Sequence, residues 1–455
     1  MNCWPRFTSW KRTAGRVFCV FAVILATASL SPCQINHLER SLHLLSQQKL
    51  NQAAQEARLA LADPATRPQA WGILGTILLQ QGKYGEGAQD LQKALALNPR
   101  LVGARINLGE AFLSLGRTAS AREAFETALH LDPTNYNARL DLAQLEASLH
   151  HYQQSLKVVQ PILPRLKETS NGLTLLASDY LGLGQLDSAG QNYQLALRLK
   201  PKCILCEMGI AKIAEQQGKS EKALAYLIKA RQLGPDDPEV LYEFGKVCLE
   251  RDLVDDAFTA LQKAATLKPH QDRYVYALAS AYVAKDHYPD AAALFGQLLK
   301  KHPQDPVLNY AAGAVRYLQA DYKPAEALLR KSIALEPHQL AAYYYLGLAY
   351  ERQNQNAEAA KTFRKLLKRY PKHAPSYLAL GTVLLREKEY SQARKALERA
   401  ISLDPDSSDA HYQMALLLGR TGESAGSRRE TLIARKLEAE TRKKHGMDLH
   451  LLLPN

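Results

Sequence analysis

The stretch "VGARINLGEAFLSLGRTASAREAFETALHLDPTN", Val102 to Asn135, decides the fold. Apolar residues recur at helical spacing in two runs, marked by Leu108 and Phe112 in the first and by Phe125 and Leu129 in the second. The letters "LGR" between the runs are typical of a turn, and the "DP" near the end stops a helix, because proline cannot continue one. The stretch therefore predicts two helices joined by a tight turn.

The same pattern returns with a period of 34 residues. Prolines follow this period apart from one double interval: Pro99, Pro133, Pro201, Pro235, Pro269, Pro303, Pro337, Pro371 and Pro405. Small residues follow it without a gap in two series: Gly75, Gly109, Ala143, Ala177, Ala211, Gly245, Ala279, Gly313, Gly347, Gly381 and Ala415, then Gly87, Ala121, Ser155, Ala189, Ala223, Ala257, Ala291, Ala325, Ala359, Ala393 and Ser427. A small residue where two helices cross lets their backbones approach closely.

The period divides the chain into units. Residues 68–407 form ten units in unbroken phase, residues 34–67 form a weaker first unit, and residues 408–441 form a terminal one, with residues 442–455 as a tail. Atypical end units are expected in a linear array, because their outer faces meet water rather than a neighbour.

The unit resembles the tetratricopeptide repeat, a 34-residue helix–turn–helix. Three units match its signature in order: Trp71, Leu74, Gly75, Gly87, Leu91, Ala94 and Pro99; Leu108, Gly109, Phe112, Ala121, Phe125, Ala128 and Pro133; Tyr343, Leu346, Gly347, Tyr350, Ala359, Phe363 and Pro371. The resemblance implies an all-α, right-handed superhelical solenoid of about twelve units. It also implies that the first helices line a concave groove, which commonly takes an extended peptide or a helix.

One unit inside the array departs from the pattern. In residues 136–169, Pro161 and Pro164 fall within the expected second helix. A proline in a helix interior removes a hydrogen bond and costs about 3 kcal/mol, so we expect a kinked or shortened helix here. The unit then serves either as a hinge between two halves or as a locally degenerate repeat held by its neighbours.

The N-terminus has the pattern of an export signal. Basic residues precede the uncharged run Val17 to Leu30, which is shorter than the roughly 20 residues a membrane span needs. Residues 26–28 read Ala-Thr-Ala, so we expect a signal peptide of residues 1–28, cleaved after Ala28, and a location in the periplasm or cell envelope. Two alternatives remain: a lipid anchor at Cys33, in "LSPC", and an uncleaved membrane anchor.

Bulk composition excludes little. The 455 residues carry a formal net charge of +13, and 46% are apolar, which is typical of a globular chain. The basic excess permits contact with acidic polymers or lipids, but a solvated helical surface explains it as well, and we expect no nucleic acid partner.

Candidate binding residues come from the positions that the resemblance places on or beside the groove. The fifth position of the unit carries tyrosine at Tyr242, Tyr276, Tyr310, Tyr344 and Tyr412, and the sixth carries Tyr345. Tyrosine offers a broad apolar face and a hydroxyl at low entropy cost, so this tyrosine ladder is a candidate binding surface. Alternatively, the rings fill gaps between neighbouring first helices. Tyr343, one residue before Tyr344, occupies the inward fourth position and is expected in the core.

Charged residues also recur near the groove. The thirteenth position carries Arg352, Arg386 and Arg420, and the ninth carries Lys212 and Lys246. Arginines in register could hold carboxylates or phosphates with two hydrogen bonds each, or they could solvate the rim.

Catalytic and metal-binding patterns are weak. "GESAG" around Ser424 matches G-x-S-x-G but falls in a turn between helices, whereas that motif needs a preceding strand. Cys203 and Cys206 form C-x-x-C at a helix start, where they could form a disulfide or serve as small buried residues, and no further pair of zinc ligands is evident. We expect no enzyme activity and no cofactor.

The sequence therefore predicts a non-catalytic scaffold that binds a partner peptide or protein segment in its groove. The competing hypothesis is a glycan or exopolysaccharide binder of an export machinery, in which the same tyrosines would stack on sugars.

Overall fold

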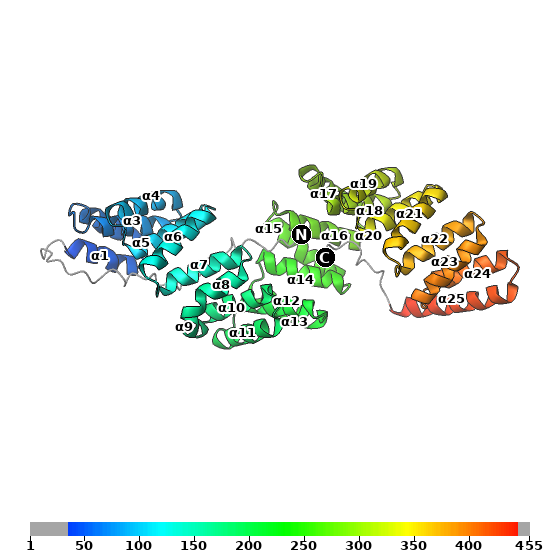
Figure 1. Ribbon diagram of the computed structural model, residues 1–455, viewed down its shortest axis with the longest axis horizontal. Coiled ribbons are helices and arrows are strands. Elements are labelled where there is room, and N and C mark those ends of the chain that lie inside the picture. Colours follow the sequence, from blue (N-terminus) through cyan, green and yellow to red (C-terminus); the bar gives the residue numbers. More distant parts are fainter. Residues whose placement is uncertain (1–34, 445–455) are drawn as a thin grey trace. The chain divides into compact units, whose positions relative to one another are not determined.

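The computed structural model describes residues 35–444, with side-chain surroundings from residue 37 to residue 440. This part of the chain is built from helices and has no strand (Figure 1). Two compact units divide it: unit 1 ends at Gln216, and unit 2 begins at Gln217. The predicted all-α repeat fold is confirmed.

The helices follow one another in pairs along the chain, and the boundary between the units falls between α12 and α13, the two helices of one repeat. Unit 1 contains α1 (Ile35–Ser46), α2 (Leu50–Ala60), α3 (Arg67–Gln80), α4 (Tyr84–Leu97), α5 (Val102–Ser114), α6 (Thr118–Leu131), α7 (Tyr136–Ser148), α8 (Tyr152–Val159), the 3₁₀ turn η2 (Gln160–Ile162), α9 (Leu163–Lys167), α10 (Ser170–Gly182), α11 (Leu186–Leu199) and α12 (Ile204–Gln216). Unit 2 contains α13 (Ser220–Leu233), α14 (Pro238–Glu250), α15 (Val254–Leu267), α16 (Asp272–Ala284), α17 (Tyr288–Lys301), α18 (Pro306–Leu318), α19 (Tyr322–Leu335), α20 (Leu340–Arg352), α21 (Asn356–Arg369), α22 (Ala374–Arg386), α23 (Tyr390–Leu403), α24 (Ser408–Arg420) and α25 (Ser424–Lys444).

The helices keep the period of the sequence. From α5 to α24, first helices start at intervals of 34 residues, as at Val102, Tyr136 and Ser170. Contacts run between neighbours: α18 packs on α19, α19 on α20, and α18 also touches α20. Within each unit the repeats therefore form a linear stack in which each pair is held by the pairs beside it.

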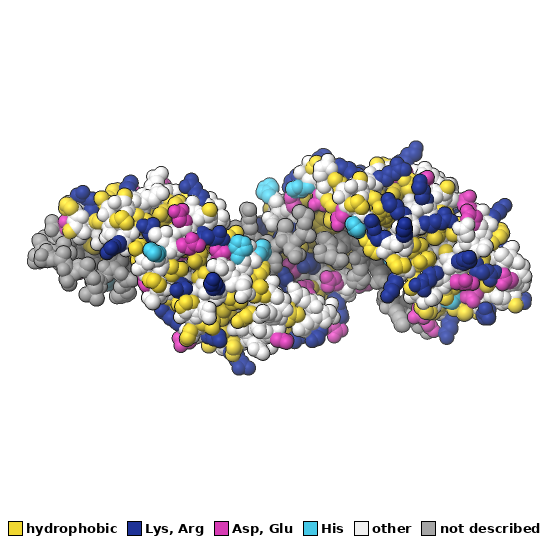
Figure 2. Space-filling model, viewed as in Figure 1, with side chains coloured by type: hydrophobic (Ala, Val, Ile, Leu, Met, Phe, Trp, Pro, Cys, Tyr) yellow, Lys and Arg dark blue, Asp and Glu magenta, His cyan; other side chains and the backbone are white. Residues whose placement is uncertain are grey.

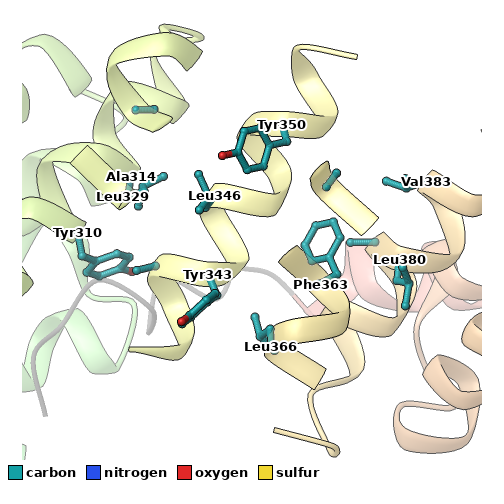
Figure 3. Packing of buried hydrophobic residues seen from close by; sticks show 14 of the residues in the cluster. Tyr310, Ala314, Leu329, Tyr343, Leu346, Tyr350, Phe363, Leu366, Leu380 and Val383 are labelled. Atoms are coloured by element: carbon teal, nitrogen blue, oxygen red, sulfur yellow. The ribbon is translucent and has the colours of Figure 1, made fainter. Parts of the chain in front are cut away.

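Glycines mark the closest approach within a helix pair. A Cβ atom added to Gly109 would lie 2.5 Å from Cε1 of Phe125, and one added to Gly347 would lie 2.4 Å from Cε1 of Phe363. Gly75, Gly245, Gly313 and Gly381 meet a leucine sixteen residues later in the same way. Phe125 and Phe363 are fully buried, and Figure 3 shows Phe363 within the core of its repeat. In these repeats, the small residue of the first helix thus leaves room for one large side chain, phenylalanine or leucine, of the second helix.

The repeat with two internal prolines has the expected broken second helix. Its α8 spans 8 residues, against 14 in α6 and α11, and is followed by η2 and the short α9. Pro161 lies in η2, and Pro164 lies in the first turn of α9. The N–H groups of a first turn have no partner within the helix, so a proline there costs no helical hydrogen bond. The boundary between the two units lies elsewhere, at Gln216, so the hinge interpretation stays a prediction.

The turns between paired helices share one strained position. Glycine has positive φ there at Gly82, Gly116, Gly184 and Gly422, but five successive repeats of unit 2 use other residues: Asp252, Asp286, Ala320, Asn354 and Lys388. At Ala320 φ is 60°, and its N–H donates to Tyr317 O while the N–H of Asp321 donates to Arg316 O, which closes a Schellman turn. The left-handed region costs an alanine about 1 kcal/mol relative to glycine.

Unit 2 ends in a helix with a polar outer surface. α25 packs on α24 and buries Ala434, whereas Arg428, Arg435 and Lys436 are exposed. Side chains of both charges lie over α23 to α25 in Figure 2. No helix in the described part of the chain is long and apolar enough to cross a membrane.

We predict that Ala320→Gly stabilises unit 2 by about 0.5–1 kcal/mol, because relief of the left-handed strain exceeds the greater chain entropy of glycine. The measurement is the urea midpoint followed by circular dichroism. Gly116→Ala, at the same turn position in unit 1, is the matched reverse and should destabilise by about 1 kcal/mol. A lower midpoint for Ala320→Gly would contradict this account of the turn.

Candidate functional site

The predicted tyrosine ladder lies on the first helices of unit 2, but its members differ in exposure. Tyr242, Tyr276 and Tyr344 are half-buried on α14, α16 and α20, and Tyr310 on α18 is buried, with 4% of its surface exposed. Tyr412 on α24 is 50% exposed. Burial raises the pKa of Tyr276 and of Tyr310, and it raises that of Tyr344 to about 12, so these hydroxyls stay protonated at neutral pH.

Rings of α18 and α20, with others from α19, α21 and the turn before α22, form one aromatic cluster. Its members are Tyr310, Tyr317, Tyr322, Tyr344, Tyr345, Phe363 and His373. Tyr345 joins the two helices, with ring centroids 6.1 Å from Tyr310 and 5.6 Å from Tyr317. The alternative that the rings fill gaps between neighbouring first helices therefore holds for Tyr310. Tyr343 is buried in the core, as predicted (Figure 3).

A second aromatic group lies at the start of unit 2. The ring of Tyr242 packs 5.3 Å from that of Tyr274, and the Arg273 guanidinium lies over both rings. Arg273 Nη1 donates to Glu239 Oε1 at 3.0 Å, and the hydroxyl of Tyr274 donates to Glu239 Oε2 at 2.9 Å. Sequence reasoning missed this cluster, although Glu239 and Arg273 are 34 residues apart and hold equivalent positions.

The three periodic arginines all reach back to the preceding first helix. Arg352 is hydrogen-bonded to the hydroxyl of Tyr317, Arg386 pairs with Glu351 Oε1 at 2.9 Å, and Arg420 donates to the carbonyl of Leu385 at 3.1 Å. Each partner stands 35 residues before its arginine. The series therefore links neighbouring repeats, while the side chains stay exposed enough to meet a ligand as well.

The two predicted lysines lie in different units. Lys246 on α14 pairs with Glu243 at 2.8 Å and lies over the Tyr242 ring, 5.3 Å from its centroid. Lys212 on α12 belongs to unit 1 and is half-buried. The structure therefore does not place the two lysines in one described site.

An apolar surface runs over the last first helices of unit 2. Tyr344, Leu378 and Tyr412 stand 34 residues apart in the fifth position, and Leu348, Thr382 and Leu416 stand beside them in the ninth. Neighbouring first helices touch from α20 to α22 and from α22 to α24, so the six residues form two adjoining columns, which we call the apolar columns. Exposure grows toward the end: Leu378 is half-buried, whereas Tyr412 and Leu416 are exposed. Sequence analysis named the tyrosines but missed the leucines.

Comparison with protein-family models settles the family. Models described as tetratricopeptide or TPR repeats match residues 78–126 and 112–178, 208–272 and 276–334, 341–373, and 381–422. The chain belongs to the tetratricopeptide repeat family. A comparison with curated proteins gave no match.

Two solved structures are similar to this chain. The crystal structure of the APC/C heterotetramer Cut9–Hcn1 matches with a TM-score of 0.51 and 15% identity, over 86% of this chain and 97% of that one. A tetratricopeptide repeat protein from Parabacteroides merdae matches with a TM-score of 0.46 and 20% identity, over 55% of this chain and 98% of that one. At 15% identity the likeness to Cut9–Hcn1 concerns the fold alone.

Catalytic and metal patterns can now be located. Ser424 of "GESAG" is the first residue of α25, with no strand before it among the described residues. Within the same part of the chain, no group of three or more His, Cys, Asp or Glu side chains could hold a metal ion. Cys203 and Cys206 are joined by a disulfide, which is one of the two alternatives that the sequence left open. The predicted signal peptide and Cys33 lie outside the described residues.

Unit 1 contains a buried carboxyl with a displaced pKa. Asp179 on α10 is fully buried and accepts a hydrogen bond from Ser155 Oγ of α8 at 2.6 Å, while its Oδ1 has no hydrogen-bond partner. Burial raises its pKa to about 7, although the Ser155 bond acts in the opposite direction. The native state therefore holds a proton on Asp179 across a pH range in which the unfolded chain has released it.

We predict that this proton makes unit 1 less stable as pH rises. The folded pKa lies above the unfolded value of 3.8, so the contribution is present below about pH 4 and is lost as pH rises through about 7. Between pH 4.5 and pH 8 the loss is on the order of 3 kcal/mol. Asp179→Asn, which is neutral in both states, should exceed the original chain by about 1 kcal/mol at pH 4.5 and by about 4 kcal/mol at pH 8, as read from urea midpoints.

The matched control is Asp187→Asn on α11, where the carboxyl is exposed. It should leave the pH dependence of the midpoint unchanged. Equal pH dependence in Asp179→Asn and in the original chain would show that Asp179 is ionised in the native state.

Proposed function

We propose that the chain is a protein-interaction scaffold that binds a partner segment across the first helices α20, α22 and α24 of unit 2. Tetratricopeptide repeats commonly bind protein partners, and no feature described above performs chemistry on a substrate. The observation that carries the proposal is the apolar pair on α24: Tyr412 and Leu416 are adjacent on one helix face and are 50% and 37% exposed.

The apolar columns define the chemistry of the partner. Tyr344 and Leu378 continue the exposed pair inward and are half-buried, so a partner side chain can reach apolar surface on three successive helices. Large apolar and aromatic side chains contribute most of the binding energy at protein interfaces. The partner segment should therefore present leucine, methionine or aromatic residues toward this face.

Charge beside the columns adds a second requirement. Arg386 and Arg420 lie at the ends of α22 and α24 and remain exposed although each has an internal partner. Guanidinium groups can bind further carboxylates through their remaining N–H donors. Acidic residues of the partner, placed to one side of its apolar residues, would complement these arginines.

The glycan alternative has no specific observation in its favour. Sugar stacking requires a row of open ring faces, whereas Tyr310 is buried, and Tyr344 and Tyr345 pack against each other at 5.9 Å between ring centroids. Of the ladder, only Tyr412 is exposed, and a single such ring does not make a polymer track.

The test of the scaffold proposal is capture of envelope proteins by the purified chain, with the captured proteins identified by mass spectrometry. Tyr412→Ala combined with Leu416→Ala should reduce capture of the main partner at least about tenfold, because it removes both exposed anchors. Both positions are exposed, so the fold and the urea midpoint should change little.

The matched control is Leu432→Ala on α25, an equally apolar residue that is 67% exposed but off the columns. It should capture the partner as well as the original chain does. Undiminished capture by the Tyr412/Leu416 double variant would refute the proposed surface.

We further propose that this scaffold works outside the cytoplasm, from the signal pattern of residues 1–28. Expression of the full chain in a bacterium should yield a mature protein that begins at Ser29, as measured by intact mass. Incorporation of labelled fatty acid at Cys33 would instead indicate the lipoprotein alternative, and an unprocessed cytoplasmic chain would contradict export.

A further inference from the structure

Unit 1 contains a disulfide that constrains almost nothing. It joins Cys203, just before α12, to Cys206 in the first turn of that helix, only three residues later. The same turn is already closed by backbone bonds, since the N–H groups of Cys206 and Glu207 both donate to the carbonyl of Cys203 at 3.1 Å. A disulfide stabilises chiefly by closing a long loop in the unfolded chain, and this loop is very short. A structural role therefore explains the bond poorly.

The two sulfurs differ sharply in access. Cys206 is completely buried, whereas Cys203 is half-buried and is preceded in the sequence by the exposed Lys202. Leu205, between the cysteines, is 38% exposed and offers an apolar contact beside them. Of the two cysteines, only Cys203 has part of its surface open to solvent, so a thiolate that approaches from solvent meets Cys203 first.

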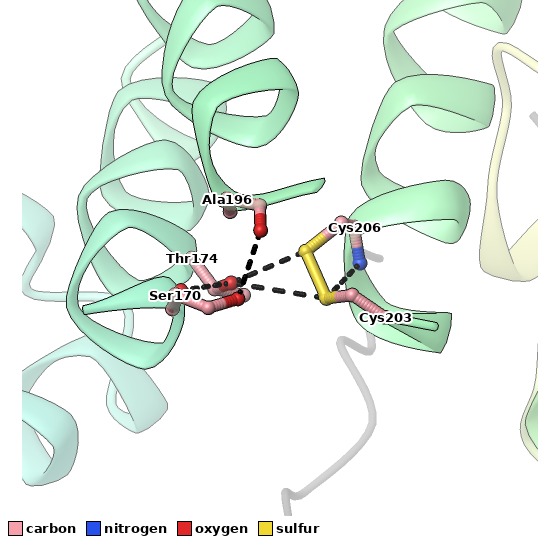
Figure 4. Close-up of a disulfide and its surroundings, with 5 residues drawn as sticks. All are labelled: Ser170, Thr174, Ala196, Cys203 and Cys206. Atoms are coloured by element: carbon pink, nitrogen blue, oxygen red, sulfur yellow. Dashed lines mark hydrogen bonds between the residues drawn. A yellow bond between two sulfur atoms is a disulfide. The ribbon is translucent and has the colours of Figure 1, made fainter. Parts of the chain in front are cut away.

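The surroundings also distinguish the sulfurs chemically (Figure 4). The N–H of Cys206 donates to Cys203 Sγ at 3.2 Å, which stabilises a negative charge on that atom at the start of a helix. Cys206 Sγ lies 3.3 Å from the hydroxyl oxygen of Thr174, whose own hydrogen goes to the carbonyl of Ser170 at 2.7 Å. In the reduced chain, Thr174 can therefore accept the hydrogen of a Cys206 thiol, while burial disfavours a thiolate there.

We propose that Cys203–Cys206 is a thiol–disulfide exchange site at which a dithiol partner reduces the chain through Cys203. A partner thiolate attacks Cys203 Sγ, a bond forms between them, and the Cys203–Cys206 bond breaks. Cys206 leaves with the electron pair and takes up a proton. The second thiol of the partner then loses its proton and attacks the partner sulfur of the mixed disulfide, and Cys203 leaves as the thiolate. In sum, two electrons and one proton pass from the partner, which starts as one thiolate and one thiol, to the chain, which ends with the Cys203 thiolate and the Cys206 thiol, and the partner becomes a disulfide.

The proposal does not depend on the binding function of unit 2. The other described cysteine, Cys248 on α14, is buried, and burial raises its pKa to about 12, so it stays an unreactive thiol. Tryptic cleavage after Lys202 and Lys212 releases Cys203 and Cys206 in one peptide without any other cysteine. Their redox state in the full chain can therefore be read by peptide mass without interference.

The first test equilibrates the full chain, without denaturant, in mixtures of reduced and oxidised dithiothreitol and measures the state of that peptide after acid quenching. We expect the air-oxidised chain to contain the disulfide and to become fully reduced while its circular dichroism remains that of the folded protein. A peptide with two free thiols after air oxidation would overturn the proposal. So would a disulfide that resists the dithiol until urea unfolds the chain.

The second test separates the roles of the two sulfurs with oxidised glutathione as the probe. Cys206→Ser should form a mixed disulfide at Cys203 at least about tenfold faster than Cys203→Ser forms one at Cys206, because only Cys203 has part of its surface open to solvent. Equal rates would overturn the assignment. If either variant loses its helical signal, alkylation of the reduced original chain with limiting iodoacetamide decides the point, since fragmentation of the peptide shows which cysteine reacted first.

Discussion

The contact between a large side chain of one helix and the bare backbone of its partner is the constraint on which the whole stack depends. Phe125 rests on Gly109, and Phe363 rests on Gly347, with no room for even one added carbon atom. This contact sets the distance within each pair, and that distance sets where the next pair can lie. The same spacing of sixteen residues recurs in repeat after repeat, so the helix pairs pack alike. Contacts between neighbouring helices are therefore enough to maintain the 34-residue period.

Most of the fold could be predicted from the sequence, because its determinants are local and repeated. The helix pairs, the turns and the broken second helix at Pro161 and Pro164 follow from apolar period, small residues and proline chemistry. The division of the chain at Gln216 could not be predicted in this way, because the 34-residue phase runs through it unchanged. Periodicity describes each repeat and its neighbours, whereas this division falls between α12 and α13, the two helices of one 34-residue repeat.

The candidate site was only partly predictable, since equivalent positions acquire different surroundings. Tyr310 and Tyr412 occupy the same place in their repeats, yet Tyr310 is buried beside Tyr345 of the following first helix, while among the described residues no first helix follows α24, which carries Tyr412. The arginine series shows a related effect. Its regular spacing predicts a ligand, which stays a prediction, and the structure adds that each guanidinium has a partner 35 residues back, as Arg386 has in Glu351. A residue that recurs with the period can stabilise contacts between repeats as readily as it can bind a ligand.

The polar surface of α25 has a consequence for how molecules of this protein meet one another. Within unit 2, pairs such as α18–α19 and α20–α21 are covered by the pairs beside them, so a stack that ended in an ordinary pair would offer its last face to the first face of another copy and could grow into a filament. α25 instead carries Arg428, Arg435 and Lys436 outward and buries little beyond Ala434. A second copy that docked there would have to strip water from these charges without providing partners for them. The charges of α25, the last helix that the structure describes, thus oppose the stacking of a second copy on this face.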